Sequence, residues 1–99
     1  MDSEPTPQPQ LSAADRKHLR GLAMRLKPLV FIGKSGLTDS VIAATHKAFE
    51  KTELLKLKIK VDDRAQRETI VAELAAATDA QVAGQVGKTA ALYRKKAET

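Results

Sequence analysis

The residues of this sequence best suited to chemistry form a short basic turn bracketed by two glycines: Gly33, Lys34, Ser35 and Gly36. Two glycines three positions apart allow the backbone to fold tightly and to approach another molecule closely. Thr38 is the predicted N-cap of a following helix, and the N-terminus of a helix attracts anions. Exposed amides, a lysine and a positive helix end therefore predict a binding site for an anion such as a phosphate.

The same four residues are also compatible with an ordinary turn or with part of a nucleotide-binding loop. A Gly-x-x-Gly sequence is also common in ordinary strand-to-helix turns. The order Gly33-Lys34-Ser35 further resembles the end of a nucleotide-binding P-loop, but the first glycine of that motif would fall at Pro28. The residues between are apolar rather than a phosphate cradle, so the pattern argues against nucleotide hydrolysis.

The sequence offers no pattern typical of catalysis or metal binding. It has no cysteine, and its two histidines, His18 and His46, are isolated from each other. The adjacent pair Asp62-Asp63 lies at a predicted helix start, where capping explains it. We therefore expect no catalytic residue, no metal and no cofactor.

Aromatic residues are few, which bears on how a nucleic acid would be bound. The sequence contains only Phe31, Phe49 and Tyr93. We assign both phenylalanines to the core, so an aromatic platform for stacking bases is not expected. Recognition of the sugar-phosphate backbone remains.

The positive charge is concentrated ahead of the glycine turn. The formal net charge is +5, and the isoelectric point is near 9.7. Residues 11–36 contain six basic residues and one acid, a balance of +5, whereas residues 37–99 contain eleven basic residues and nine acids. This distribution favours a polyanionic partner.

A basic helix is predicted before the turn, over residues 13–26. Ser12 and Asp15 form a variant of the capping box, and leucines follow at helical spacing. Pro28 then ends the helix. One edge of the helix is expected to be a basic ridge, which is either an ordinary solvated face or a binding surface: Arg16, Arg20 and Lys27.

Four segments complete the pattern around the turn. Residues 29–32 are continuously apolar, which favours a central strand covered on both faces. A helix over 38–51 follows, and residues 55–61 then alternate strictly between apolar residues and lysines. We expect Lys56, Lys58 and Lys60 on an uncovered face of the sheet, where they either bind RNA or keep the sheet soluble. A third helix runs from Asp63 to about 78.

The last segments, 81–86 and 89–94, read as two strands joined by a glycine turn at Gly87-Lys88. The order helix, strand, helix, strand, helix, strand, strand predicts an α/β two-layer sandwich with a mixed four-stranded sheet.

The chain is expected to form one domain, over residues 11–96, after a disordered proline-rich tail at 1–10. No apolar run approaches the length of a membrane span, and the first residues lack the order of a signal peptide. We therefore expect a cytoplasmic protein with no membrane partner.

Several of these segments together resemble the CRM domain (chloroplast RNA splicing and ribosome maturation) in its bacterial, single-domain, YhbY-like form. The likeness covers about residues 11–95, with these matching segments: 19–23, 26–28, 33–38, 53–58, 87–89 and 92–94. Ala90 and Ala91 are smaller than the residues usual in the last strand. The resemblance implies a fold similar to the C-terminal domain of translation initiation factor 3, association with precursors of the large ribosomal subunit, and a Gly-x-x-Gly loop likened to that of KH domains.

The combined reading is a non-enzymatic protein that binds RNA, expected to be ribosomal RNA in pre-large-subunit particles. An alternative is a protein-interaction module that docks on a ribosomal protein through its uncovered sheet face. The candidate RNA-binding residues lie in the turn, in or just after the first helix, in the alternating strand and in the last two segments: Gly33, Lys34, Ser35, Gly36, Arg16, Lys17, Arg20, Lys27, Lys56, Lys58, Lys88 and Arg94.

Overall fold

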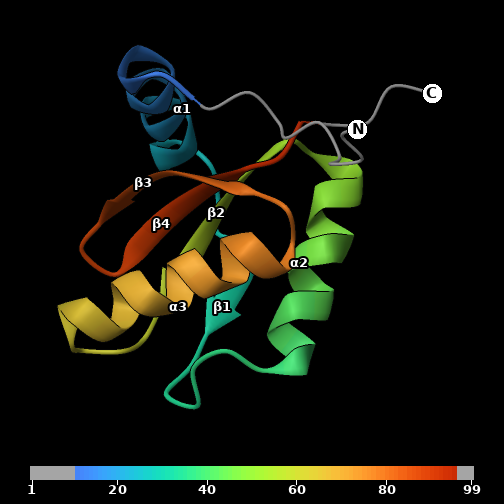
Figure 1. Cartoon of the computed structure of the whole chain (residues 1–99), viewed down its shortest axis with the longest axis vertical. Helices are drawn as coiled ribbons and strands as arrows, with labels where there is room; N and C mark the ends of the chain where they lie inside the picture. The colour runs from blue at the N-terminus through green and yellow to red at the C-terminus, as the bar shows by residue number, and fades with distance from the viewer. Residues whose placement is uncertain (1–10, 96–99) are drawn as a thin grey trace, which may run out of the picture.

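The computed structural model describes residues 11–95, so the predicted tail at 1–10 lies outside the described residues. A four-stranded sheet with the strand order β1-β2-β4-β3 forms the centre of the fold (Figure 1). The elements follow the predicted order: α1 (Ala13–Met24), β1 (Val30–Ile32), α2 (Asp39–Lys51), β2 (Leu54–Ile59), α3 (Arg64–Ala77), β3 (Gln81–Val86) and β4 (Thr89–Tyr93). β1 and β2 are parallel, and the other two pairings are antiparallel. The predicted α/β class with a mixed sheet is confirmed.

Each helix begins at the residue that the sequence predicts, because a side chain there satisfies a free backbone amide. Ser12 and Asp15 form the capping box of α1. The Oγ1 atom of Thr38 accepts a hydrogen bond from the Val41 amide at 3.2 Å, and the Oδ2 atom of Asp63 accepts one from the Gln66 amide at 3.1 Å. These side chains fix where α2 and α3 start. The start of α2 in turn determines where the glycine turn ends.

The main core lies between the sheet and the two later helices, α2 and α3, which cover the same face (Figure 1). The alternating residues of β2 supply Leu55, Leu57 and Ile59 to it, each with no exposed surface. Phe49 of α2 and Leu74 of α3 pack against them. This alternation directs the lysines of β2 to the opposite face, as predicted.

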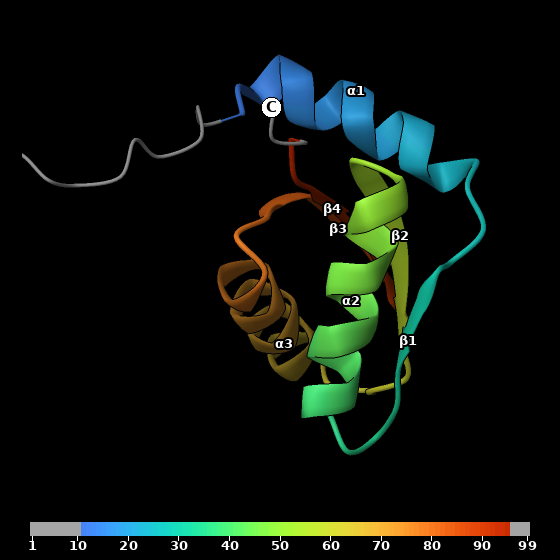
Figure 2. The same ribbon diagram turned by 90° about the vertical axis from the view of Figure 1, so that its right-hand side faces the viewer.

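The opposite face is only partly open, because α1 packs across it (Figure 2). A small cluster of Ala23, Ala83 and Ala91 lies between α1 and strands β3 and β4. A side chain at Gly84 would come within 2.6 Å of the Cδ atom of Arg20, so this glycine leaves room for Arg20 to cross the strand. The expectation of an uncovered sheet face is therefore wrong for β3 and β4 and correct only beside β1 and the exposed lysines of β2.

The expectation that residues 29–32 form a central strand covered on both faces is wrong. β1 is an edge strand that pairs only with β2. Val30 and Ile32 are buried, but the Phe31 side chain between them is 59% exposed and Leu29 is 54% exposed. The assignment of Phe31 to the core is likewise wrong, because α1 does not extend over this edge of the sheet. Phe49 is buried as predicted.

The first helix is shorter than predicted, ending at Met24 rather than at residue 26. The chain leaves the helix two residues early, and Lys27 therefore does not belong to the helical ridge. Leu22 and Leu26, two of the leucines at helical spacing, are 43% and 40% exposed. Only Ala23 of this helix is fully buried, and it packs with Ala83 and Ala91, against which Leu19 and Leu54 are partly buried.

Candidate nucleic-acid interface

The glycine turn lies at the carboxyl end of β1, where the parallel crossover through α2 begins. The Gly36 amide donates a hydrogen bond to the Gly33 carbonyl at 3.0 Å, which closes the turn. Gly36 has a φ angle of 74°, a left-handed conformation that favours glycine. Gly33 does not adopt this conformation, and the space where its side chain would lie is open. The two glycines therefore serve different purposes: one makes the turn, and the other leaves the backbone accessible.

Lys34 and Ser35, at the tip of the turn, are exposed. Among residues 11–95, Lys34 takes part in neither of the two ion pairs, so its ammonium group is available to a ligand. The N-terminus of α2 begins at Asp39, directly after the turn. A positive charge, exposed residues of the turn and a helix N-terminus thus meet here, as the sequence predicts.

An open cleft of about 370 Å³ separates the turn from the N-terminal half of α3. Its lining is mostly apolar, with a lysine and two polar side chains: Lys34, Gly36, Val61, Ala65, Gln66, Thr69 and Ile70. The sequence does not reveal this cleft, because its two walls are nearly thirty residues apart in the chain. The turn therefore has a concave surface beside it.

Two further lysines lie at this end of the sheet. The Lys60 amide donates to the Ile32 carbonyl at 2.7 Å, which fixes Lys60 beside the first residues of the turn. Lys88, in the turn between β3 and β4, forms an ion pair with Asp62 at 2.8 Å. The hydrogen bond from Lys88 and its charge hold the pKa of Asp62 below the ordinary value. Lys88 is thus partly neutralised by a carboxylate before any ligand arrives.

The lysines of β2 occupy the open part of the sheet. Lys58 is exposed and lies directly beside Phe31 in the parallel register of β1 and β2. Lys56 is half-buried, and its Nζ atom donates to the Met24 carbonyl at the end of α1, at 3.3 Å. Lys58 is therefore accessible to a ligand, while Lys56 also ties α1 to the sheet.

The basic residues of α1 lie far from the glycine turn. Figures 1 and 2 show α1 at one end of the longest axis and the loop between β1 and α2 at the other. Arg16 donates to the Leu11 carbonyl at 3.1 Å, Lys17 is exposed, and the stem of Arg20 crosses Gly84. Although these basic residues closely precede the turn in the sequence, they form a second group in the structure.

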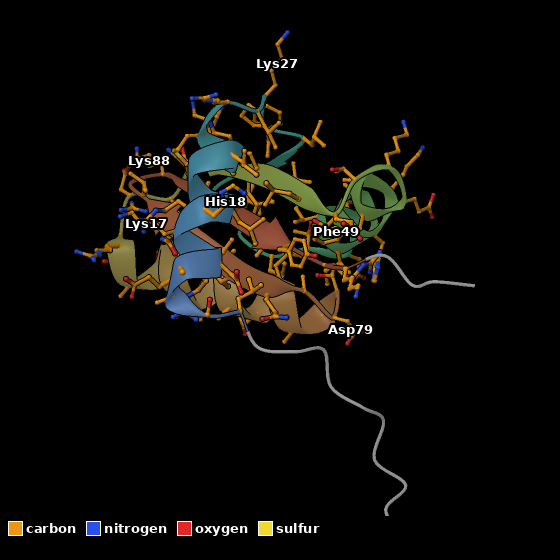
Figure 3. The ribbon with its side chains drawn as sticks, turned by 90° about the horizontal axis from the view of Figure 1, so that it is seen from above. Lys17, His18, Lys27, Phe49, Asp79 and Lys88 are labelled. Carbon is orange, nitrogen blue, oxygen red and sulfur yellow. The ribbon has the colours of Figure 1, made fainter. Side chains whose placement is uncertain are left out.

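The last two predicted residues have opposite surroundings. Lys27 extends away from the body of the molecule beyond the end of α1 (Figure 3). Arg94, by contrast, donates to the Thr78 carbonyl at 3.0 Å, and its guanidinium lies 4.6 Å from the centre of the Phe49 ring. It also contacts Nδ1 of His46 at 3.3 Å. Arg94 therefore links α2, α3 and the end of β4, a role in the fold that its position after a strand does not reveal.

Arg67 is a buried cation that the sequence reading did not single out. Its Nη1 atom donates to the carbonyls of Val61 and Asp62, both at 2.7 Å. These bonds hold the segment between β2 and α3, which forms part of the cleft beside the turn. The guanidinium thus positions one wall of the candidate interface rather than contacting solvent.

Within residues 11–95, no group of three His, Cys, Asp or Glu side chains could hold a metal ion. The same part of the chain has no helix that is both long and apolar enough to cross a membrane. The geometry described above is that of an exposed cationic surface.

Comparisons with known proteins identify the relatives of this chain. The family model for the CRS1 / YhbY (CRM) domain matches residues 11–94. A Haemophilus influenzae protein named "RNA-binding protein" is 34% identical over 88 residues, which cover 89% of each chain. A Pseudomonas aeruginosa protein named "probable RNA-binding protein" is 31% identical over 85 residues, covering 86% of this chain and 82% of the relative.

The fold is also similar to a solved structure. The solution structure of a hypothetical protein from Staphylococcus aureus superimposes with a TM-score of 0.82 and 25% sequence identity. The match covers 90% of this chain and 93% of the other. The arrangement of three helices on a four-stranded sheet is therefore shared.

Proposed function

We propose that this chain, which belongs to the CRS1 / YhbY (CRM) domain family, is an RNA-binding protein without enzymatic activity. We further propose that the glycine turn holds the RNA backbone. The relatives described above carry names that refer to RNA binding. In this proposal Gly33, Lys34, Ser35 and Gly36 contact a phosphate, and the basic residues of α1 neutralise others.

One observation carries the proposal: Lys34 is exposed beside two glycines and a helix N-terminus, and it forms no ion pair with any residue of the range 11–95. Each of these features favours an anion, and here they lie next to one another directly after β1. An ordinary strand-to-helix turn needs Gly36 for its left-handed φ angle but gives no reason for an open position at Gly33.

The decisive experiment replaces Lys34 and Ser35 with aspartates. We expect the affinity for RNA to fall at least about 10-fold, because two negative charges now face the phosphates. The thermal midpoint should stay near that of the parent protein, since both side chains are exposed and acids are tolerated near a helix start.

A matched control makes the same change in net charge elsewhere. Lys47→Asp with Ala72→Asp alters exposed positions on α2 and α3. This control should bind RNA with nearly the parent affinity. Near-normal affinity of the Lys34→Asp, Ser35→Asp variant, at near-normal stability, would reduce the loop to a simple turn.

The proposed cellular partner is the precursor of the large ribosomal subunit, in the cytoplasm. The resemblance to the YhbY-like form of the CRM domain supports this step. The protein should sediment with large-subunit precursors in a density gradient, and ribonuclease treatment should release it. Co-sedimentation that resists ribonuclease would favour the alternative, docking on a ribosomal protein.

A further inference from the structure

An aromatic side chain lies exposed on the open part of the sheet. Phe31 is 59% exposed, although its neighbours Val30 and Ile32 are buried in the main core. A phenylalanine gains little stability from such a position, and large apolar side chains on a surface often mark a binding site. Leu29, 54% exposed two residues earlier, extends the apolar surface.

The surroundings of Phe31 are basic. Lys58 lies directly beside it on β2, and the Lys60 amide is bonded to the next carbonyl of β1. Neither β1 nor β2 contains an acidic residue. The ring is therefore flanked by positive charge that no carboxylate of these two strands neutralises.

The position of Phe31 links it to the glycine turn. It precedes Gly33 by two residues of an extended strand, a separation of about 7 Å. In the other direction, β1 begins near the end of α1, where Lys56 reaches the Met24 carbonyl. The open strip of β1 and β2 thus runs between the two basic groups that the fold separates.

We propose that Phe31 stacks with a base of single-stranded RNA whose backbone lies on Lys58 and the glycine turn. This inference rests on the proposed function and adds to it the class of RNA bound, because a base held in a duplex cannot present its face to the ring. Stacking on an aromatic side chain tolerates any base, so the contact adds affinity more than sequence preference.

The charge of the strip favours RNA over a protein as its occupant. An apolar protein surface on Phe31 and Leu29 would also have to cover Lys58, and burying an unpaired ammonium group is costly. Alternating bases and phosphates meet both needs, since the base covers the ring while the phosphate pairs with the lysine.

Fluorescence can test the contact directly, because the chain contains no tryptophan. Phe31→Trp places a single indole on the strip. We expect its emission to be strongly quenched by a saturating single-stranded oligoadenylate, with RNA binding monitored independently by anisotropy of a labelled RNA. A Val86→Trp variant is the matched control: this position is 52% exposed on β3, at the opposite edge of the sheet, and its emission should not change.

A second measurement gives the size of the contact. Phe31→Ala should weaken binding of the single-stranded RNA by roughly 5- to 100-fold and leave binding of a blunt duplex RNA nearly unchanged. Unquenched emission from a Phe31→Trp protein that is saturated with RNA would overturn the stacking proposal alone. A protein that binds none of these RNAs would instead overturn the proposed function. If Phe31→Ala leaves RNA affinity intact but abolishes ribonuclease-resistant co-sedimentation with ribosomal particles, the strip is a protein-docking surface.

Discussion

At the scale of single residues, the two glycines of the turn allow folding and the proposed binding to be tested separately. Gly36→Ala should lower the free energy of unfolding by about 1–2 kcal/mol, because its φ angle of 74° is unfavourable for a residue with a Cβ atom. Gly33→Ala should leave that free energy nearly unchanged, since no atom beyond the adjacent residues lies within 4 Å of the added methyl group. Chemical denaturation of both variants measures the difference.

The same pair then tests how closely RNA approaches. If a phosphate contacts the backbone at Gly33, the Gly33→Ala variant should bind RNA more weakly although it is as stable as the parent protein. Unchanged affinity would mean that the side chains of Lys34 and Ser35, and not the backbone, make the contact. Gly36→Ala is unsuited to this question because strain and binding change together.

Arg94 shows that a basic residue near the end of a strand can belong to the fold. Arg94→Ala should lower the free energy of unfolding by about 1–3 kcal/mol, through loss of the bond to Thr78 and the contact with Phe49. Arg94→Lys keeps the charge but not the planar group, and should recover only part of the loss. Thermal or urea unfolding measures both.

RNA affinity of the folded Arg94 variants is the control for that prediction. The affinity should match that of the parent protein in both cases. Loss of affinity in Arg94→Ala, with recovery in Arg94→Lys, would instead assign the charge of Arg94 to RNA binding.

At the scale of elements, α1 and the glycine turn lie at opposite ends of the molecule. Arg16→Glu with Lys17→Glu should weaken binding of a long RNA by about 10-fold or more through repulsion of phosphates. Combined with Lys34→Asp and Ser35→Asp, the losses should add as free energies, because distant sites are nearly independent. Lys47→Glu with Lys51→Glu, on α2, makes the same change in net charge and serves as the control in titrations of RNA affinity.

A result in which the α1 variant loses no affinity would make its basic face a solvated surface. A combined loss well below the sum would mean that the two groups share one phosphate cluster, contrary to their separation in Figures 1 and 2.

The helix starts and the hairpin were predictable because local signals determine them. Ser12, Thr38 and Asp63 each cap the helix that follows, and Gly87, with a φ angle of 58°, makes the turn of the hairpin. The ends were less predictable. α1 ends at Met24 because the chain must turn toward β1, a requirement set by the sheet rather than by the residues of the helix.

The position of β1 in the sheet illustrates what sequence could not provide. Residues 29–32 are all apolar, so no alternation distinguishes a covered face from an open one. Only the strand order reveals that β1 is at an edge and that Phe31 is exposed. The candidate turn was predictable from four adjacent residues, whereas its cleft and the separation from α1 depend on tertiary packing.

At the scale of the whole molecule, the charge predicts how binding depends on salt. If about 4–6 phosphates are neutralised, log K should fall with log salt with a slope near −3 to −5. Titrations of one RNA at several salt concentrations give this slope. A slope shallower than about −1 would contradict binding through phosphates. A stacked base would contribute a part of the binding free energy that does not depend on salt.

The alanine cluster beneath α1 bears on how firmly this helix is held. Ala23, Ala83 and Ala91 are small, and each buried methyl group contributes only about 0.8 kcal/mol, while Leu19 and Leu54 beside them are only partly buried. The core beneath α2 and α3 is instead built from leucine, isoleucine and phenylalanine side chains. The helix that carries Arg16, Lys17 and Arg20 is consequently the one whose detachment should cost least, so local opening of α1 should precede global unfolding. An RNA that contacts both α1 and the open strip of β1 and β2 would hold this helix against the sheet. Part of the binding free energy would then be used to suppress the local opening of α1.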